Sequence, residues 1–198
     1  MEKSKNKKSY KYILSEVVGM VKSACERDER WKYHVFPVVR YGKLLASKLR
    51  ADKEVVELSC WLHDLTRIRG DVKNHHITSS IEAEKILKAL GYDDEKIYKV
   101  RGCIYAHRGS VKVVKKNIEE EIVACADSMA HFEFAIILFY SAFGRKKLSL
   151  EDGTEWISAK IERSWKKISI PMAKRVVEKR YRELKYILSY KKEKEVSQ

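Results

Sequence analysis

The chain has 198 residues, of which 44% are hydrophobic and 35% are charged, so we expect a globular protein and exclude a disordered one. No apolar run approaches the roughly 20 residues that a membrane helix requires, and the N-terminus has no signal-peptide pattern. We therefore expect a cytoplasmic protein with no membrane partner. The four cysteines form no CxxC pair and lie in apolar helical patterns, which predicts buried thiols and disfavours a cysteine-based zinc site.

The net charge of +14 is concentrated at the two ends of the chain. Residues 1–12 carry +4 and residues 160–198 carry +8, which leaves the middle nearly balanced. Basic ends can bind nucleic acid or an acidic surface, although solvated helix faces that aid solubility are the more frequent explanation.

Segments with a 3.6-residue hydrophobic period dominate the sequence and hairpin signals are scarce, so an all-α fold is predicted, with at most a two-stranded piece of sheet. We expect one domain spanning residues 1–198, with a core at 30–140 and C-terminal helices at 150–191 packed on it. The expected helices span residues 10–27, 33–49, 52–67, 77–90, 94–106, 119–143, 151–167 and 171–191.

The stretch from Val55 to Leu62 has only two polar residues, Glu57 and Ser59, which predicts a helix that is buried nearly all round. It leads directly into His63-Asp64. An ionised carboxylate beside a core needs a partner, and imidazole with carboxylate suits a divalent metal. On this stretch alone, a helix end whose polar groups simply face solvent is an equal alternative.

Two further polar residues lie on predicted core faces. His34 shares a face with Val38 and Tyr41, and Asp127 lies inside the apolar segment IVACADSMA. Aspartate is almost never buried without a partner, so Asp127 is the sharpest anomaly of the sequence. His131, one turn later, is either a partner of Asp127 or an ordinary helix-face residue.

The order and spacing of these groups resemble the HD-domain superfamily of metal-dependent phosphohydrolases over roughly residues 30–140. His34 resembles the first metal histidine of that family, His63-Asp64 the pair that names it, and Asp127 its final metal aspartate. The resemblance implies an HD-domain helical bundle with additional C-terminal helices. It also implies that His34, His63, Asp64 and Asp127 bind a divalent ion, which could be Mn, Fe, Ni, Co, Zn or Mg.

The chain departs from the family pattern at two places. Thr66-Arg67 stand where such families often have Gly-Lys, and Arg67 could keep a phosphate-facing role with a different geometry. Ser79-Ser80, at the end of HITSS, replace the Gly-Ala of the usual His-x3-Gly-Ala segment, and that alignment places His75 rather than His76 in the family position. His107, after CIYA, resembles a further histidine of small family members that serves a second metal or the phosphate.

The resemblance implies a hydrolase, a phosphomonoesterase or phosphodiesterase in which a metal-activated water attacks phosphorus. The expected catalytic residues are Asp64, Arg67, His75 and His107. Arg67 or His75 would offset charge on the phosphoryl oxygens, and His107 or His75 would give the leaving group a proton.

The expected partner is a small phosphorylated substrate, such as a nucleotide or another phosphate ester. Two other functions remain as alternatives, a non-catalytic HD-fold module that senses a nucleotide and a nucleic-acid-binding protein that uses the basic termini. The complete set of ligand residues favours the enzyme. The segment LTRIRG lacks the acidic residues that usually follow the HD pair in stringent-response hydrolases, which argues against that subgroup. No oligomeric state is predicted.

Overall fold

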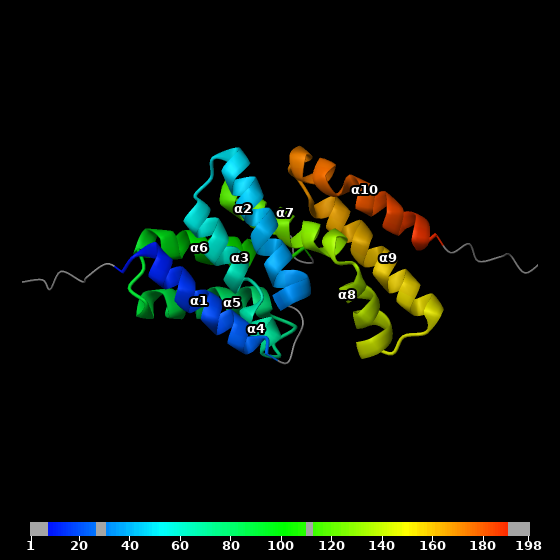
Figure 1. Ribbon diagram of the computed structural model, residues 1–198, viewed down its shortest axis with the longest axis horizontal. Helices are drawn as coiled ribbons and strands as arrows, with labels where there is room; N and C mark the ends of the chain where they lie inside the picture. Colours follow the sequence, from blue (N-terminus) through cyan, green and yellow to red (C-terminus); the bar gives the residue numbers. More distant parts are fainter. Residues whose placement is uncertain (1–7, 27–30, 110–112, 190–198) are drawn as a thin grey trace, which may run out of the picture.

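The computed structural model describes residues 8–26, 31–109 and 113–189, and within these ranges it contains helices and turns but no strand (Figure 1). The predicted all-α class is therefore confirmed. The elements are α1 (Tyr10–Ala24), the π-helical turn η1 (Trp31–Val35), α2 (Phe36–Leu49), α3 (Lys53–Leu62), α4 (Leu65–Ile68), α5 (His75–Ala89), α6 (Asp94–Ala106), α7 (Ile118–Glu133), α8 (Ile136–Phe139), the π-helical turn η2 (Tyr140–Arg145), α9 (Leu150–Lys167) and α10 (Pro171–Ile187).

Helix α3 is the buried helix that its apolar composition predicts. Every residue from Val55 to Leu62 is buried except Glu57, and the helix is in contact with α1, α2, α6 and α7. Because each buried aliphatic side chain contributes roughly 1.5–3 kcal/mol, α3 is firmly held. Its C-terminal end is therefore a rigid support for the polar residues that follow. The four cysteines are all buried, as predicted, and no disulfide joins them.

Helix α7 is the second central element. Its residues from Ile122 to Phe132 are all buried, because α2, α6, α9 and α10 cover different sides of it. Asp127 therefore lies in the middle of a helix that has no solvent-facing side along that stretch.

Local capping signals explain several helix starts. The Asp52 carboxylate accepts hydrogen bonds from the backbone N–H groups of Glu54 and Val55, as the sequence predicts for an N-cap. Asp93 and Asn117 cap α6 and α7 in the same way. After α5 the chain turns through Gly91, whose φ of 76° is favoured by glycine.

The predicted helix at 52–67 is interrupted. It ends at Leu62, and α4 begins at Leu65 after a turn formed by His63 and Asp64. Asp64 has φ −113° and ψ 14°, a sparsely populated conformation that is common in active sites. The prediction missed the break because apolar residues resume at Leu65, immediately after the turn. The predicted start of the next helix at Ile77 was late, since α5 begins at His75.

The predicted helix at 119–143 is also broken. Phe134 has φ −125° and ψ 63°, which ends α7, and the segment Ile136–Arg145 leaves at a bend of 80°. Apolar residues on both sides of Phe134 conceal this break in the sequence, because a hydrophobic period records burial rather than helix direction.

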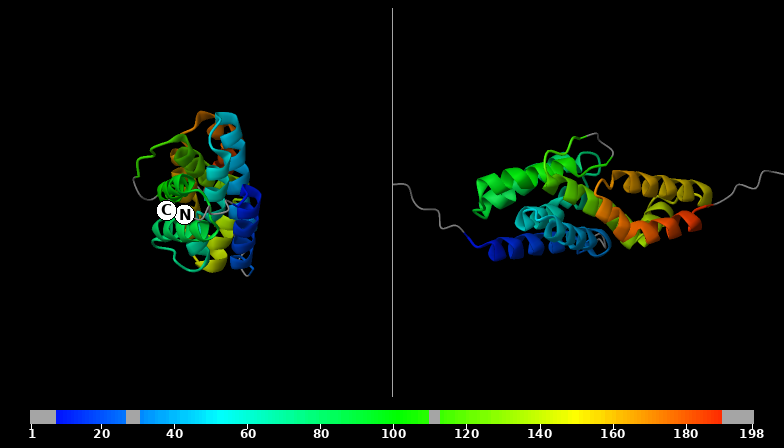
Figure 2. Two further views of the ribbon diagram at one scale, coloured as in Figure 1. Left: turned by 90° about the vertical axis from the view of Figure 1, so that its left-hand side faces the viewer. Right: turned by 90° about the horizontal axis from the view of Figure 1, so that it is seen from above.

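Helices α9 and α10 lie side by side at one end of the molecule and pack on α7 (Figures 1 and 2). Trp165 of α9 stacks on Tyr181 of α10 with ring centroids 4.2 Å apart, and Phe132 of α7 meets both rings edge-on. On α10, Val177 and Leu184 are buried, whereas Val176 is 42% exposed. Residues 1–7 and 190–198, which carry part of the basic ends, lie outside the described residues.

Among the described residues, no single helix has the length and apolar composition needed to cross a membrane, and α7 passes that test only together with the segment bent away from it by 80°.

Candidate metal centre

His34 is presented by η1, immediately before α2. Pro37 lies in the first turn of α2, where the N–H that it lacks is not needed, and a π-helical turn precedes it. The His34 side chain points into the core and is only 6% exposed. Its ring stacks on His131 of α7 and meets His63 edge-on, with both centroid distances at 5.3 Å.

His63 and Asp64 occupy the turn between α3 and α4, and both are buried. The Nδ1 atom of His63 lies 2.8 Å from the carbonyl oxygen of Cys60, to which it donates a hydrogen bond. This bond fixes the tautomer in which Nε2 keeps its lone pair. His63 therefore presents an acceptor atom to the interior.

Four side chains converge at this point, and we call His34, His63, Asp64 and Asp127 the first donor set. His34 Nε2 lies 3.3 Å from His63 Nε2, 3.3 Å from Asp127 Oδ1 and 3.6 Å from Asp64 Oδ2. His63 Nε2 lies 3.9 Å from Asp64 Oδ2 and 4.0 Å from Asp127 Oδ1. Atoms that bind one ion at about 2.0–2.2 Å are at most about 4.4 Å apart, so all these spacings are compatible with a shared ion.

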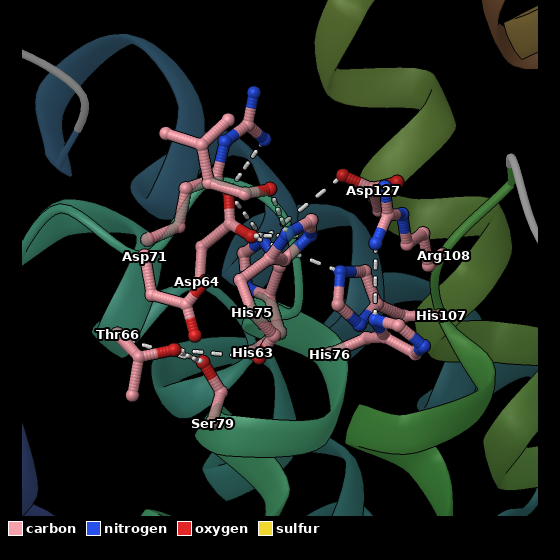
Figure 3. Close-up of polar contacts among 12 residues, drawn as sticks. His63, Asp64, Thr66, Asp71, His75, His76, Ser79, His107, Arg108 and Asp127 are labelled. Atoms are coloured by element: carbon pink, nitrogen blue, oxygen red, sulfur yellow. Dashed lines mark hydrogen bonds and ion pairs between the residues drawn. The ribbon is translucent and has the colours of Figure 1, made fainter.

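The other oxygen of Asp64 faces a second group, and we call Asp64, His75 and His107 the second donor set. Oδ1 of Asp64 lies 3.4 Å from His75 Nε2 and 3.8 Å from His107 Nε2. Each histidine lies at a helix end and donates from Nδ1 to a carbonyl three residues earlier, that of Val72 for His75 and of Ile104 for His107. Figure 3 shows Asp64 on the left of the cluster, with His63 and His75 between it and the residues His107 and Asp127 on the right.

The Asp64 Oδ1 atom is buried and has no hydrogen-bond partner within the described part of the chain. A buried carboxylate oxygen without a partner costs roughly 1–3 kcal/mol or more. The atoms around it, two histidine Nε2 atoms with lone pairs, cannot donate to it in the tautomers described. A cation between Asp64, His75 and His107 would satisfy all three, so the donor set fits a metal ion.

Comparisons with known proteins agree with this geometry. The HD domain family profile matches residues 31–131, which include every member of both donor sets. This chain belongs to the HD domain family. A search of curated proteins found no match.

Two solved structures share the fold of this HD domain protein. One is an HD-superfamily hydrolase from Bacillus thuringiensis, with a TM-score of 0.69, 16% identity, and coverage of 91% of this chain and 95% of that one. The other is a predicted HD superfamily hydrolase from an uncultured Thermotogales bacterium, with a TM-score of 0.55, 18% identity, and coverage of 75% and 85%. Because it covers 91% of this chain, the first likeness extends beyond the residues that the family profile matches.

The protonation states of residues in the two donor sets favour the binding of a cation. Burial lowers the pKa of His63 and of His75, and burial with the neighbouring His63 lowers the pKa of His107 to about 3. Burial would raise the pKa of Asp64, but Arg67 and the surrounding imidazoles outweigh it and hold that pKa well below its usual range. Near neutral pH the centre therefore combines neutral imidazoles with an ionised carboxylate, the forms that bind metals.

His75 and His76 have different surroundings. His75 faces Asp64, whereas His76 Nδ1 lies 3.3 Å from Arg108 Nη1, and its ring packs near Tyr105 (Figure 3). Hydrogen bonds between α4 and α5 hold His75 in place, because Thr66 Oγ1 lies 2.8 Å from both Ser79 Oγ and Thr78 Oγ1. The serine that replaces the usual glycine of the family thus joins the two helices.

Arg67 contacts the donor sets from the cavity side. Its Nη1 atom donates to Asp64 Oδ2 at 3.0 Å, and 35% of its side chain is exposed. It borders a cavity of about 230 Å³ together with His75, His107 and Asp127.

Sequence reasoning missed the contribution of α9 to this site. Lys160, Arg163, Ser164 and Lys167 all line the same cavity. Lys167 donates to Asp127 Oδ2 at 2.6 Å, and Ser164 Oγ lies 3.0 Å from Nδ1 of His131. The 160/163/164/167 spacing indicates one helix face, but basic residues on a helix are ordinarily solvated, so this pattern was not a usable signal.

The burial of the α9 cations affects their acidity. Burial lowers the pKa of Lys160 to about 8, against the opposing attraction of Asp127. For Asp127, burial would raise the pKa, but Lys167 and the nearby histidines dominate and hold it well below its usual range. Near pH 7 this wall of the cavity is therefore predominantly cationic.

Proposed function

We propose that this HD domain is a metal-dependent phosphohydrolase that acts on a nucleotide or another small phosphate ester. The observation that carries this proposal is the shared position of Asp64. Its two oxygens face two donor sets, and members of both sets line the cavity that Arg67, Lys160 and Lys167 also line. A metal centre beside positive charge suits an anionic ester better than a neutral substrate.

In this proposal His34, His63, Asp64 and Asp127 hold one divalent ion, and Asp64, His75 and His107 hold a second. A bound divalent ion would lower the pKa of a coordinated water and offset charge on a phosphoryl oxygen. Imidazole-rich sets of this kind favour Mn, Fe, Co, Ni or Zn over Mg, which prefers oxygen ligands.

The hydrogen bonds of His75 and His107 bear on their role. Both rings donate from Nδ1 to a backbone carbonyl, and both have lowered pKa values, so their Nε2 atoms act as acceptors near neutral pH. We therefore assign them to a second ion rather than to protonation of the leaving group. This choice differs from the proton-donor role considered above.

Arg67 has the contacts expected of a residue that orients both Asp64 and substrate. One N–H group is used on Asp64, and guanidinium carries further donors in a planar fork that suits phosphoryl oxygens. Lys would supply a single ammonium, so an arginine here can hold the carboxylate and bind the substrate at once.

A second hollow of about 470 Å³ borders α9 and the end of α10, but its chemistry does not suit a phosphate. Glu151, Asp152, Glu155 and Glu162 line it, and these carboxylates repel an anion. The smaller cationic cavity is therefore the proposed substrate site.

The test is metal analysis of protein purified without chelator, followed by phosphatase and phosphodiesterase assays with added Mn, Co, Ni or Mg. We expect bound transition metal and hydrolysis of at least one class of phosphate ester, both abolished by Asp64→Ala. Metal-dependent nucleotide binding without turnover would instead support the sensing module. Absence of bound metal after equilibration with each ion would overturn the assignment of the centre.

A further inference from the structure

Helix α9 presents a row of cations to the cavity from outside the region matched by the HD profile. Lys160, Arg163 and Lys167 are spaced by three and four residues, so they lie on one face of the helix. All three line the cavity that contains His75, His107 and Asp127. At 1.5 Å per residue, the row extends for about 10 Å along the helix axis.

The members of this row differ in their protein partners. Lys167 is neutralised by Asp127 at 2.6 Å. Neither Lys160 nor Arg163 forms an ion pair with any described carboxylate. Lys160 is half-buried, and the attraction of Asp127 offsets only part of the cost of burying its ammonium group. The arrangement becomes favourable when an anion occupies the cavity.

The positive lining continues away from the donor sets. A second groove of about 490 Å³ shares Arg108, Gly109, Arg163 and Lys167 with the cavity and adds Lys115 and Lys166. No carboxylate is among the described residues that line this outer groove. Val113 and Val114 add an apolar strip to it, which an organic group could contact.

We propose that the α9 row and the outer groove bind the non-scissile phosphates of a substrate that carries a chain of linked phosphates, as a nucleoside diphosphate or triphosphate does. This inference rests on the proposed phosphohydrolase function and narrows its substrate class. One phosphoryl group is matched by the metal centre with Arg67. Lys160, Arg163 and Lys166 then supply positive charge for the further phosphates, because a single phosphate bound at the metal centre does not extend to them.

Binding can be tested without turnover. Chelator-treated protein is titrated calorimetrically with inorganic tripolyphosphate and with orthophosphate at one fixed ionic strength, because these contacts weaken with salt. We expect tripolyphosphate to bind at least tenfold more tightly than orthophosphate. Arg163→Ala should remove most of that difference, and its exposed position means that folding should be retained.

The matched control is Arg175→Ala on α10. Arg175 is also an exposed arginine, it lines neither the cavity nor the outer groove, and its removal changes the net charge equally. We expect the Arg175→Ala variant to bind tripolyphosphate with the same affinity as the unaltered protein. An equal loss in both variants would mean that only the net charge matters, which would overturn the assignment.

A kinetic comparison separates this inference from the proposed function. With Mn added, kcat/KM is measured for a nucleoside triphosphate and its monophosphate, and Arg163→Ala should reduce the ratio of the two at least tenfold. If nothing is hydrolysed but tripolyphosphate binding depends on Arg163, the groove assignment stands and the hydrolase proposal fails. Hydrolysis with equal affinity for tripolyphosphate and orthophosphate would overturn the groove. Tighter binding of single-stranded oligothymidylate than of tripolyphosphate would overturn its assignment to a small molecule.

Discussion

The ammonium group of Lys167, at the end of α9, donates a hydrogen bond to Asp127, in the middle of α7, with a nitrogen–oxygen distance of 2.6 Å. Only 10% of the Lys167 side chain and 12% of the Asp127 side chain are exposed. Gly109 leaves room for the lysine stem, because a Cβ atom there would lie 2.7 Å from Lys167 Cδ. The C-terminal helices thus contact a member of the first donor set directly.

Lys167→Gln should destabilise the metal-free protein more than the metal-loaded one. Removing one partner of a buried ion pair costs about 3–5 kcal/mol, and a bound cation can replace part of the lost charge. Denaturant unfolding with and without saturating Mn measures both values. The control is Lys166→Gln, an exposed neighbour whose change should stay within about 0.5 kcal/mol. Equal losses of unfolding free energy with and without Mn would show that Asp127 does not bind the ion.

Asp64→Ala should abolish both metal binding and turnover while the fold survives. The carboxylate belongs to both donor sets, so its loss removes one atom from each. Because Asp64 Oδ1 has no hydrogen-bond partner among the described residues and Arg67 can turn to solvent, we expect the metal-free variant to lose at most about 1–3 kcal/mol. Metal stoichiometry and melting temperature are measured on the same sample. Unchanged metal content with a large fall in melting temperature would rule out the proposed role.

His107→Gln should reduce the number of bound ions by one at saturating Mn, because it removes a member of the second donor set only. His76→Gln is the matched control, since His76 is a buried histidine that faces Arg108 instead of Asp64. Elemental analysis after equilibrium dialysis gives the stoichiometry. Two ions retained in His107→Gln would contradict the second donor set.

Thr66→Val should lower the free energy of unfolding by about 1–3 kcal/mol, because it leaves the buried Ser79 hydroxyl without the Thr66 hydroxyl at 2.8 Å. Valine keeps the shape of threonine, so packing changes little. Since the lost bonds join α4 to α5, the affinity of the second ion should fall with stability. Calorimetric titration of the variant with Mn checks this, and unchanged affinity for both ions would show that the network does not position His75.

The surroundings of Glu133 indicate that the stability of the protein depends on pH. Burial would raise its pKa, but the hydrogen bond from Tyr41 and the charges of Arg40 and Arg180 dominate and lower it below the ordinary value of 4.5. A lowered folded-state pKa stabilises the protein above pH 4.5, and this contribution disappears as the pH falls through the folded-state pKa.

Glu133→Gln should therefore destabilise the protein by about 1–3 kcal/mol between pH 5 and 7, and the difference from the unaltered protein should shrink below about pH 4.5. Urea unfolding across this pH range measures the difference. A difference that stays constant down to pH 3 would contradict an ionised Glu133 in the folded state.

Several site residues could be predicted from the sequence because they break the pattern of their own helix. Asp127 stands inside an apolar segment, and His63-Asp64 follow a helix that is apolar nearly all round. Burial of a carboxylate without compensation is too costly to be accidental, so such residues mark a polar centre wherever their helix packs. The structure brings both to the same place as His34.

Other features were decided only by tertiary packing. Consecutive residues on a helix point about 100° apart, so the docking of α5 on α4 through Thr66 and Ser79 determines that His75, and not His76, faces Asp64. The cations of α9 carry no comparable signal in the sequence, because lysine and arginine on a helix surface are ordinarily solvated. Local periodicity predicts the helical class, and the cost of burying charge points to Asp64 and Asp127. His75 and His107 were expected only from the family resemblance. The approach of Lys167 to Asp127 depends on how α9 packs against α7, which no local pattern encodes.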